Sequence, residues 1–122
     1  MSKILNKLEG MAGTDYSALV INNRPIASTF SKEEMLYLKL SQQAFVHIFK
    51  QADKIQANDL YDEAHLQLGQ RRLLCFRLED NILYISMLPQ TNDIQKAQKV
   101  IRGAFSVLRK IASASTHQPQ KN

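Results

Sequence analysis

Residues 65–88 read HLQLGQRRLLCFRLEDNILYISML, and they specify most of the predicted sheet. Apolar residues dominate it, and two short polar pairs, Gly69-Gln70 and Asp80-Asn81, interrupt it. Because such pairs suit the backbone of tight turns, the pattern predicts consecutive antiparallel strands. Together with the residues just before position 65, the predicted strands are Leu60–Leu68, Arg72–Glu79 and Ile82–Leu88, the last ended by Pro89.

A second strand pair precedes these three strands. Tyr16–Asn22 (YSALVIN) is a nearly continuous apolar run, which is typical of a strand buried on both faces. Asn22 and Asn23 tolerate positive φ and predict a tight hairpin turn. Ile26–Phe30 follows, and Pro25 at its start removes a backbone donor, which an edge strand tolerates and a central strand does not. The first strand is therefore predicted to be central and the second to lie at an edge.

Three helices are predicted around the strands. Ser2–Met11 has apolar residues at spacings of three and four. Ser31-Lys-Glu-Glu34 has the pattern of a capping box, and it opens a long uninterrupted helix that ends near Ile55. Asp93–Ala112 carries one apolar stripe and predicts an amphipathic final helix. The polar tail Ser113–Asn122 is expected to be disordered.

The order α-β-β-α-β-β-β-α predicts one α+β domain over residues 1–112, followed by the tail over residues 113–122. A lone hairpin is marginal in water, so the two groups of strands are expected to share one five-stranded antiparallel sheet. The most apolar strands, Tyr16–Asn22 and Ile82–Leu88, belong at its centre. Helices must cover both faces of the sheet because these central strands have no polar side.

The composition limits the classes of function. The 122 residues fit one domain, and 44% hydrophobic with 22% charged residues is ordinary for a globular protein. Cys75 is the single cysteine, which excludes an intramolecular disulfide and a cysteine-rich metal site. Charged residues near the N-terminus argue against a secretory signal, and no apolar run approaches the roughly 20 residues that cross a bilayer. We therefore expect a cytoplasmic protein without a transmembrane segment.

The chain resembles the roadblock/dynein light chain family in residues 5–28 (LNKLEGMAGTDYSALVINNRPIAS), in the long central helix and in residues 65–88 with the helix that follows. The resemblance covers residues 3–112. It implies a profilin-like or longin-like sheet of order 2-1-5-4-3, with the long helix on one face and the two terminal helices on the other. Two departures stand out: Pro89-Gln-Thr-Asn-Asp93 replaces a stretch that is often rich in Asp, Ala, Asn and Gly, and Asn23 and Arg24 replace the common hairpin glycine.

The long helix carries two stripes when it is plotted at about 100° per residue. The broad apolar face, predicted to lie on the sheet, comprises Tyr37, Leu38, Ala44, Phe45, Ile48, Phe49, Ala52 and Ile55. A second, half-apolar stripe comprises Leu36, Leu40, Gln43, His47, Lys50 and Lys54. Exposed apolar residues in register favour a protein interface over a scatter of surface leucines, which would need no explanation.

The family resemblance implies dimerisation through the long helix and the edge strand that follows it, here Leu60–Leu68. That strand would otherwise present an unprotected sheet edge. Pairing two such edges across a two-fold axis would join two sheets into one. Asp62, Glu63 and His65 are then expected to lie close to the dimer axis.

Catalytic and cofactor sites find little support in the sequence. A metal site made by His47 and His65 with Asp62 or Glu63 is the best combination, but it competes with ordinary surface or interface histidines. Cys75 lies in the apolar run LLCF, where a thiol is expected to be buried and inert. The four glycines form no phosphate-binding loop. We therefore expect neither enzymatic activity nor a cofactor.

The net charge of +5 raises one competing function, a basic module that binds nucleic acid or an anionic membrane surface. Its candidate residues are Lys96, Lys99, Arg102, Arg109 and Lys110 of the final helix. Most of them fall on the outward side of that helix, where charge is ordinary, and no aromatic residues are interleaved to stack on bases.

The first hypothesis is therefore a homodimeric adaptor without catalytic activity. The family resemblance implies a small Ras-like GTPase, or a larger signalling or motor scaffold, as its partner. In that arrangement the paired long helices form the docking platform, and the partner supplies all nucleotide chemistry.

Overall fold

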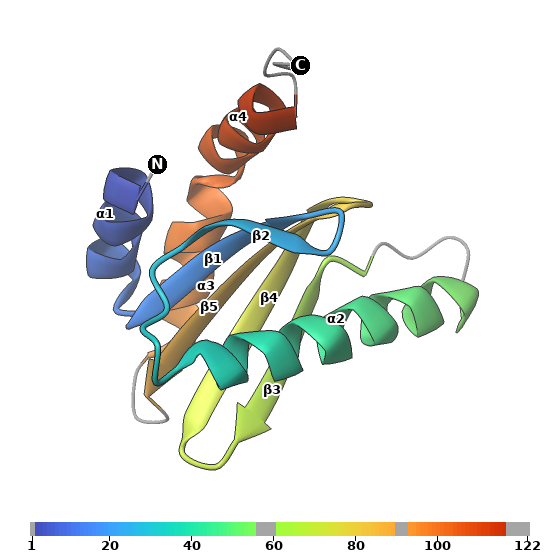
Figure 1. The fold of residues 1–122 in the computed structure, drawn as a ribbon, viewed down its shortest axis with the longest axis horizontal. Coiled ribbons are helices and arrows are strands. Elements are labelled where there is room, and N and C mark those ends of the chain that lie inside the picture. Colours follow the sequence, from blue (N-terminus) through green and yellow to red (C-terminus); the bar gives the residue numbers. More distant parts are fainter. Residues whose placement is uncertain (1, 56–60, 90–92, 117–122) are drawn as a thin grey trace.

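The computed structural model describes residues 2–55, 61–89 and 93–116 (Figure 1). Within these residues lie five strands and four helices. In chain order they are α1 (Ser2–Ala12), β1 (Tyr16–Ile21), β2 (Arg24–Ser28), α2 (Met35–Ile55), β3 (Glu63–Leu68), β4 (Arg71–Glu79), β5 (Ile82–Pro89), α3 (Ile94–Gly103) and α4 (Phe105–Thr116).

The strands form one antiparallel sheet in the order β2-β1-β5-β4-β3, which confirms the predicted topology. Asn22 and Asn23 have φ values of 51° and 64°, and they form the predicted tight turn between β1 and β2. Pro25 lies in β2 at one edge of the sheet, as its missing backbone donor predicts. The other edge is β3.

The sheet separates two apolar cores, because side chains alternate between its faces. On one face, α1, α3 and α4 pack over β-strand residues that include Leu19, Leu74, Phe76 and Tyr84. On the other face, α2 packs over Val20, Leu73, Cys75 and Ile85 through Leu38, Phe45 and Phe49. Figure 1 shows this arrangement of the long helix on one side and the terminal helices on the other, which is the predicted layering.

A buried carboxylate anchors α1 to the sheet. Glu9 is 8% exposed, and its Oε2 accepts hydrogen bonds from the hydroxyl of Ser17 in β1 and from Thr29 Oγ1 at 2.6 Å. The apolar periodicity of the first helix did not single out Glu9, because it lies between Leu8 and Ala12 on the inward side. Buried polar groups of this kind are tolerated when hydrogen bonds satisfy them.

Two helix boundaries differ from the predictions. The long helix begins at Met35, because residues 32–34 form a turn and the Glu34 carboxylate binds Arg71 of β4 at 3.2 Å instead of closing a capping box. The final helix is two helices that meet at Ala104, whose φ and ψ are −102° and 5°. Gly103 just before this break has low helix propensity.

The two ends of the predicted final helix are also informative. Asp93 caps the start of α3, because its side chain accepts a hydrogen bond from the Lys96 backbone N–H at 3.2 Å. At the other end α4 continues to Thr116, past the predicted end at Ala112. The remaining tail lies outside the described residues, as does Leu60, the predicted first residue of the edge strand.

Candidate functional site

The outer stripe of α2 is exposed along its whole length. Leu36 is 64% exposed and Leu40 is 48% exposed, although both are large apolar side chains. Gln43, His47 and Lys50 are exposed on the same side of the helix. The structure thus places these five predicted interface residues together on one solvent-facing surface.

Two residues that were predicted to face the sheet are exposed on a flank of α2 instead. Ile48 is 37% exposed and Ile55 is 74% exposed, so their assignment to the sheet-facing side is wrong. Gln42 marks the flank of α2 that faces the β1–β2 turn. Its side chain donates a hydrogen bond to the Asn23 carbonyl in that turn, at 2.7 Å. Ile48 and Ile55 lie roughly 130° around the helix from Gln42, on the flank towards β3. They widen the apolar surface in that direction.

The edge strand β3 has backbone groups available for pairing. The Arg77 N–H donates to the Asp62 carbonyl at 2.8 Å, and hydrogen-bonded pairs alternate along an antiparallel ladder. Glu63, His65 and Gln67 therefore direct their backbone N–H and C=O groups away from β4. Within the described residues, no other strand lies beside β3 on that side.

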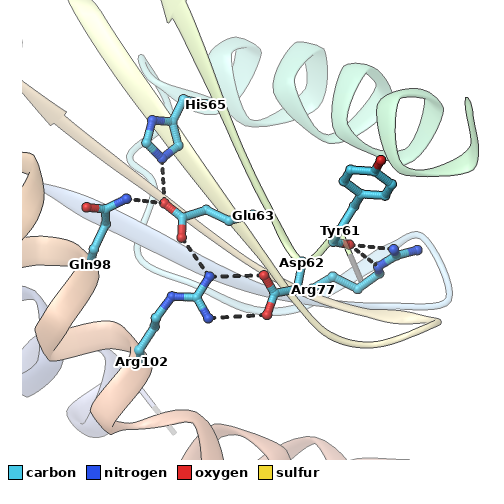
Figure 2. Close-up of polar contacts among 7 residues, drawn as sticks. All are labelled: Tyr61, Asp62, Glu63, His65, Arg77, Gln98 and Arg102. Atoms are coloured by element: carbon cyan, nitrogen blue, oxygen red, sulfur yellow. Dashed lines mark hydrogen bonds and ion pairs between the residues drawn. The ribbon is translucent and has the colours of Figure 1, made fainter. Parts of the chain in front are cut away.

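Asp62, Glu63 and His65 meet in one polar cluster that also includes two residues of α3 (Figure 2). Arg102 donates to Asp62 at 3.0 Å and to Glu63 at 2.7 Å. Glu63 also accepts from the Gln98 amide and lies 2.6 Å from His65 Nε2. Burial opposes the charge of Glu63, but the hydrogen bonds from Gln98, Arg102 and His65 outweigh it and lower the pKa of this carboxyl.

This cluster lies on the opposite side of the sheet from α2. Ala64, Leu66 and Leu68 of β3 pack into the core beneath α2, so the alternate residues Glu63 and His65 point towards α3. The predicted interface residues therefore form two groups, and the open edge of β3 runs between them. The alternative metal combination of His47 and His65 with Asp62 or Glu63 is not brought together, because the sheet separates the two histidines.

A second arginine joins the start of β3 to α2. Arg77 donates to the Tyr61 carbonyl at 3.1 Å and to both carboxylate oxygens of Asp53, at 2.8 and 2.9 Å. Its guanidinium also lies 4.7 Å from the centre of the Phe49 ring. The hydrogen bond from Arg77 lowers the pKa of Asp53. Arg77 thus holds the edge strand in a defined position beside the long helix.

A pocket of about 310 Å³ opens beside the outer stripe of α2. Val46, Phe49 and Lys50 of α2 line one wall, and residues of the β1–β2 and β4–β5 turns line the other. Four of its eleven lining residues are apolar and seven are polar or charged. This mixed lining suits an anchoring side chain of a protein partner.

Structure comparisons identify several proteins with this arrangement. An MglB structure with a tetrameric arrangement aligns with a TM-score of 0.74 at 14% identity, over 92% of this chain and 87% of that chain. Myxococcus xanthus MglB aligns with a TM-score of 0.72 at 16% identity, over 93% and 98%. A roadblock/LC7 domain from Streptomyces avermitilis aligns with a TM-score of 0.72 at 8% identity, over 89% and 98%.

Sequence comparison gives no such match: no protein-family model and no curated protein sequence matches the chain. At these low identities, the structural likeness establishes the fold and leaves the function to be argued from the surfaces. The agreement nevertheless extends over about nine-tenths of the chain. The chain therefore has the roadblock-domain fold.

Proposed function

We propose that this chain is a non-enzymatic, cytoplasmic adaptor that dimerises through the outer side of α2 and the edge of β3, and that the dimer binds a small Ras-like GTPase or its signalling complex. The partner supplies the nucleotide and its hydrolysis. The adaptor supplies a rigid surface that recognises the partner.

One observation carries this proposal: an exposed apolar surface lies next to an open strand edge. Among the described residues, eight large hydrophobic side chains are exposed, and four of them, Leu36, Leu40, Ile48 and Ile55, lie on α2. Apolar groups gathered in this way favour burial against another protein. Because a two-fold axis lets one edge strand pair with its own copy, a second chain satisfies both features at once.

One of the similar MglB structures has a tetrameric arrangement, which supports the coarser proposal that this chain associates with copies of itself. The choice of a GTPase as partner comes from the resemblance to the roadblock/dynein light chain family, in which bacterial members often regulate a GTPase. Lys50 at one end of the stripe, with the pocket beside it, is the proposed contact region for this partner.

The chemistry of the side chains fits an adaptor better than an enzyme. Cys75, the single thiol, is 0% exposed, and burial raises its pKa well above the usual range, so it remains protonated.

In the part of the chain that the structure describes, no helix is long and apolar enough to cross a membrane.

The competing function is binding to nucleic acid or to an anionic membrane. Fewer unpaired basic side chains are available for it in the structure than the sequence indicates. Arg102 is bound to Asp62 and Glu63, and Arg109 donates to the Leu78 carbonyl at 3.2 Å and lies 3.6 Å from Glu79. Their charges are largely offset within the chain. Lys96, Lys99 and Lys110 are exposed.

The proposed partner can be tested with purified Ras-like GTPases, each loaded with GDP or with a non-hydrolysable GTP analogue, and passed over the immobilised chain. We expect one GTPase to bind, with a preference for one nucleotide state, because the switch loops of such proteins change with the nucleotide. Lys50→Glu should weaken this binding about tenfold without dissolving the dimer, since Lys50 is exposed beside the pocket.

Lys32→Glu is the matched control, because it makes the same charge change at an exposed position outside α2, and it should bind the GTPase like the unmodified chain. If the panel contained no binder in either nucleotide state, the proposed GTPase partner would be wrong even if the chain were a dimer.

A further inference from the structure

A second apolar surface lies on the far side of the sheet from α2, between α1 and the junction of α3 with α4. It is a groove of about 470 Å³. Leu8, Val100, Ala104 and Leu108 line its floor and walls, and of these Leu8 and Leu108 are buried. Its rim is formed by Ile4 and Met11 of α1 and Val107 of α4, which are 40%, 54% and 45% exposed.

This groove accounts for most of the remaining exposed apolar residues. Of the eight large hydrophobic side chains that are exposed among the described residues, four lie on α2 and three on this rim. On α1 the residues Ile4, Leu8 and Met11 have the spacing of one helix face, and they oppose Val100 and Val107 across the groove. The apolar surface is therefore organised into two sites rather than scattered.

The break between α3 and α4 helps to form the groove. Gly103 lines it, and a side chain added at Gly103 would meet no atom within 4 Å of its Cβ. The missing side chain thus leaves open space beside Ala104, where the helix axis changes. A ligand can approach the backbone closely at this point.

The charges at the groove have one sign. Lys7 and Lys99 are the charged residues that line it, and both are exposed. In the described part of the chain, neither lysine is within ion-pair distance of a carboxylate. Lys3 and Lys96, on the same two helices, are also exposed, and the one acidic residue of α1, Glu9, points inward to Ser17. An occupant with an apolar face and acidic flanks complements this pattern.

We propose that this groove binds an amphipathic helix of a partner protein, with apolar side chains seated between α1 and α3–α4 and acidic residues beside Lys7 and Lys99. The shape favours such a peptide over an anionic membrane. A flat membrane surface would touch the exposed rim at Ile4, Met11 and Val107, whereas side chains projecting from a helix reach the recessed surface at Leu8, Val100 and Ala104.

This site is separate from the proposed dimer surface. The groove belongs to the α1, α3 and α4 side of the sheet, and α2 covers the opposite side (Figure 1). A dimer formed through α2 would carry two such grooves, one on each copy. The adaptor could then hold a scaffold peptide at the groove while another protein occupies the α2 side.

The test uses two fluorescent helical peptides with the same leucine face, one flanked by glutamates and the other by lysines, and follows their binding to the full chain by fluorescence anisotropy. We expect the acidic peptide to bind at least tenfold more tightly than the basic one.

Gly103→Leu should weaken binding of the acidic peptide at least tenfold, because the leucine side chain fills the groove. The variant should preserve the fold, because the added side chain meets open space and leucine favours helix.

Lys7→Glu combined with Lys99→Glu should reverse the preference between the two peptides. Lys32→Glu with Lys110→Glu has the same net charge outside the groove, and it should leave the preference for the acidic peptide unchanged. The proposal would be overturned by equal binding of both peptides, by binding that Gly103→Leu does not weaken, or by vesicles containing phosphatidylglycerol that bind the chain while the acidic peptide does not.

Discussion

Leu36→Glu combined with Leu40→Glu is expected to convert the dimer into a monomer. Both leucines lie on the outer side of α2, and a two-fold axis would bring four introduced carboxylates into one small interface. Burying a leucine side chain contributes about 1.5–3 kcal/mol, and the change removes two such contributions from each copy. Even a loss of about 4 kcal/mol raises the dissociation constant nearly a thousandfold.

The expected result is measured by sedimentation velocity over a range of protein concentrations. The fold should survive, because the two side chains are 64% and 48% exposed in the single chain, and the circular dichroism spectrum checks this. Ile26→Glu is the control: it places one carboxylate on an exposed apolar residue of β2, at the opposite edge of the sheet, and it should leave the dimer intact. A double variant that remained dimeric would contradict the proposed surface.

Arg77→Ala is expected to lower the free energy of unfolding by about 2–3 kcal/mol, which is large for a charged residue. The Arg77 side chain is only 9% exposed, it binds the Tyr61 carbonyl, and it stacks on Phe49. Alanine removes hydrogen bonds made by a charged donor and leaves a space beside the ring. Arg77→Met keeps most of the packing and should cost roughly half as much.

Chemical denaturation measures this effect, and all variants must be compared at one protein concentration because dimerisation contributes to the apparent stability. Arg24→Ala is the control, since Arg24 is exposed on the edge strand β2 and should change the stability by less than about 0.5 kcal/mol. If Arg77→Ala were as mild as Arg24→Ala, Arg77 would not be holding the start of β3 against α2.

The sheet was predictable from the sequence because local chemistry specified it strand by strand. Asn22 and Asn23 adopt the positive φ that their turn requires, and Pro25 is tolerated at an edge. The central position of β5 follows from its apolar run, in which Ile82 to Leu88 are all buried. Each of these features depends on the residue itself and its near neighbours, so periodicity and turn chemistry were sufficient.

The surfaces were less predictable because they depend on how elements far apart in sequence are placed. Helical periodicity gives the direction of Ile48 but not the sideways position of α2 on the sheet, and this position leaves Ile48 and Ile55 exposed. The ion pairs of Asp62 and Glu63 with Arg102 join residues about forty positions apart, beyond the reach of a local pattern. The groove beside Gly103 likewise exists only after α1 and α3 have packed together.

The proposed dimer can be tested most directly by cross-linking at the middle of the α2 stripe. Cys75 is fully buried, so a cysteine introduced on the surface is the reactive one. In a two-fold dimer formed by α2, Gln43 lies near its own copy, and Gln43→Cys should give a covalent dimer with a short bismaleimide. Lys110→Cys, exposed on α4, should not. A Gln43→Cys protein that stayed monomeric under these conditions, or that cross-linked no better than Lys110→Cys, would contradict dimerisation through α2.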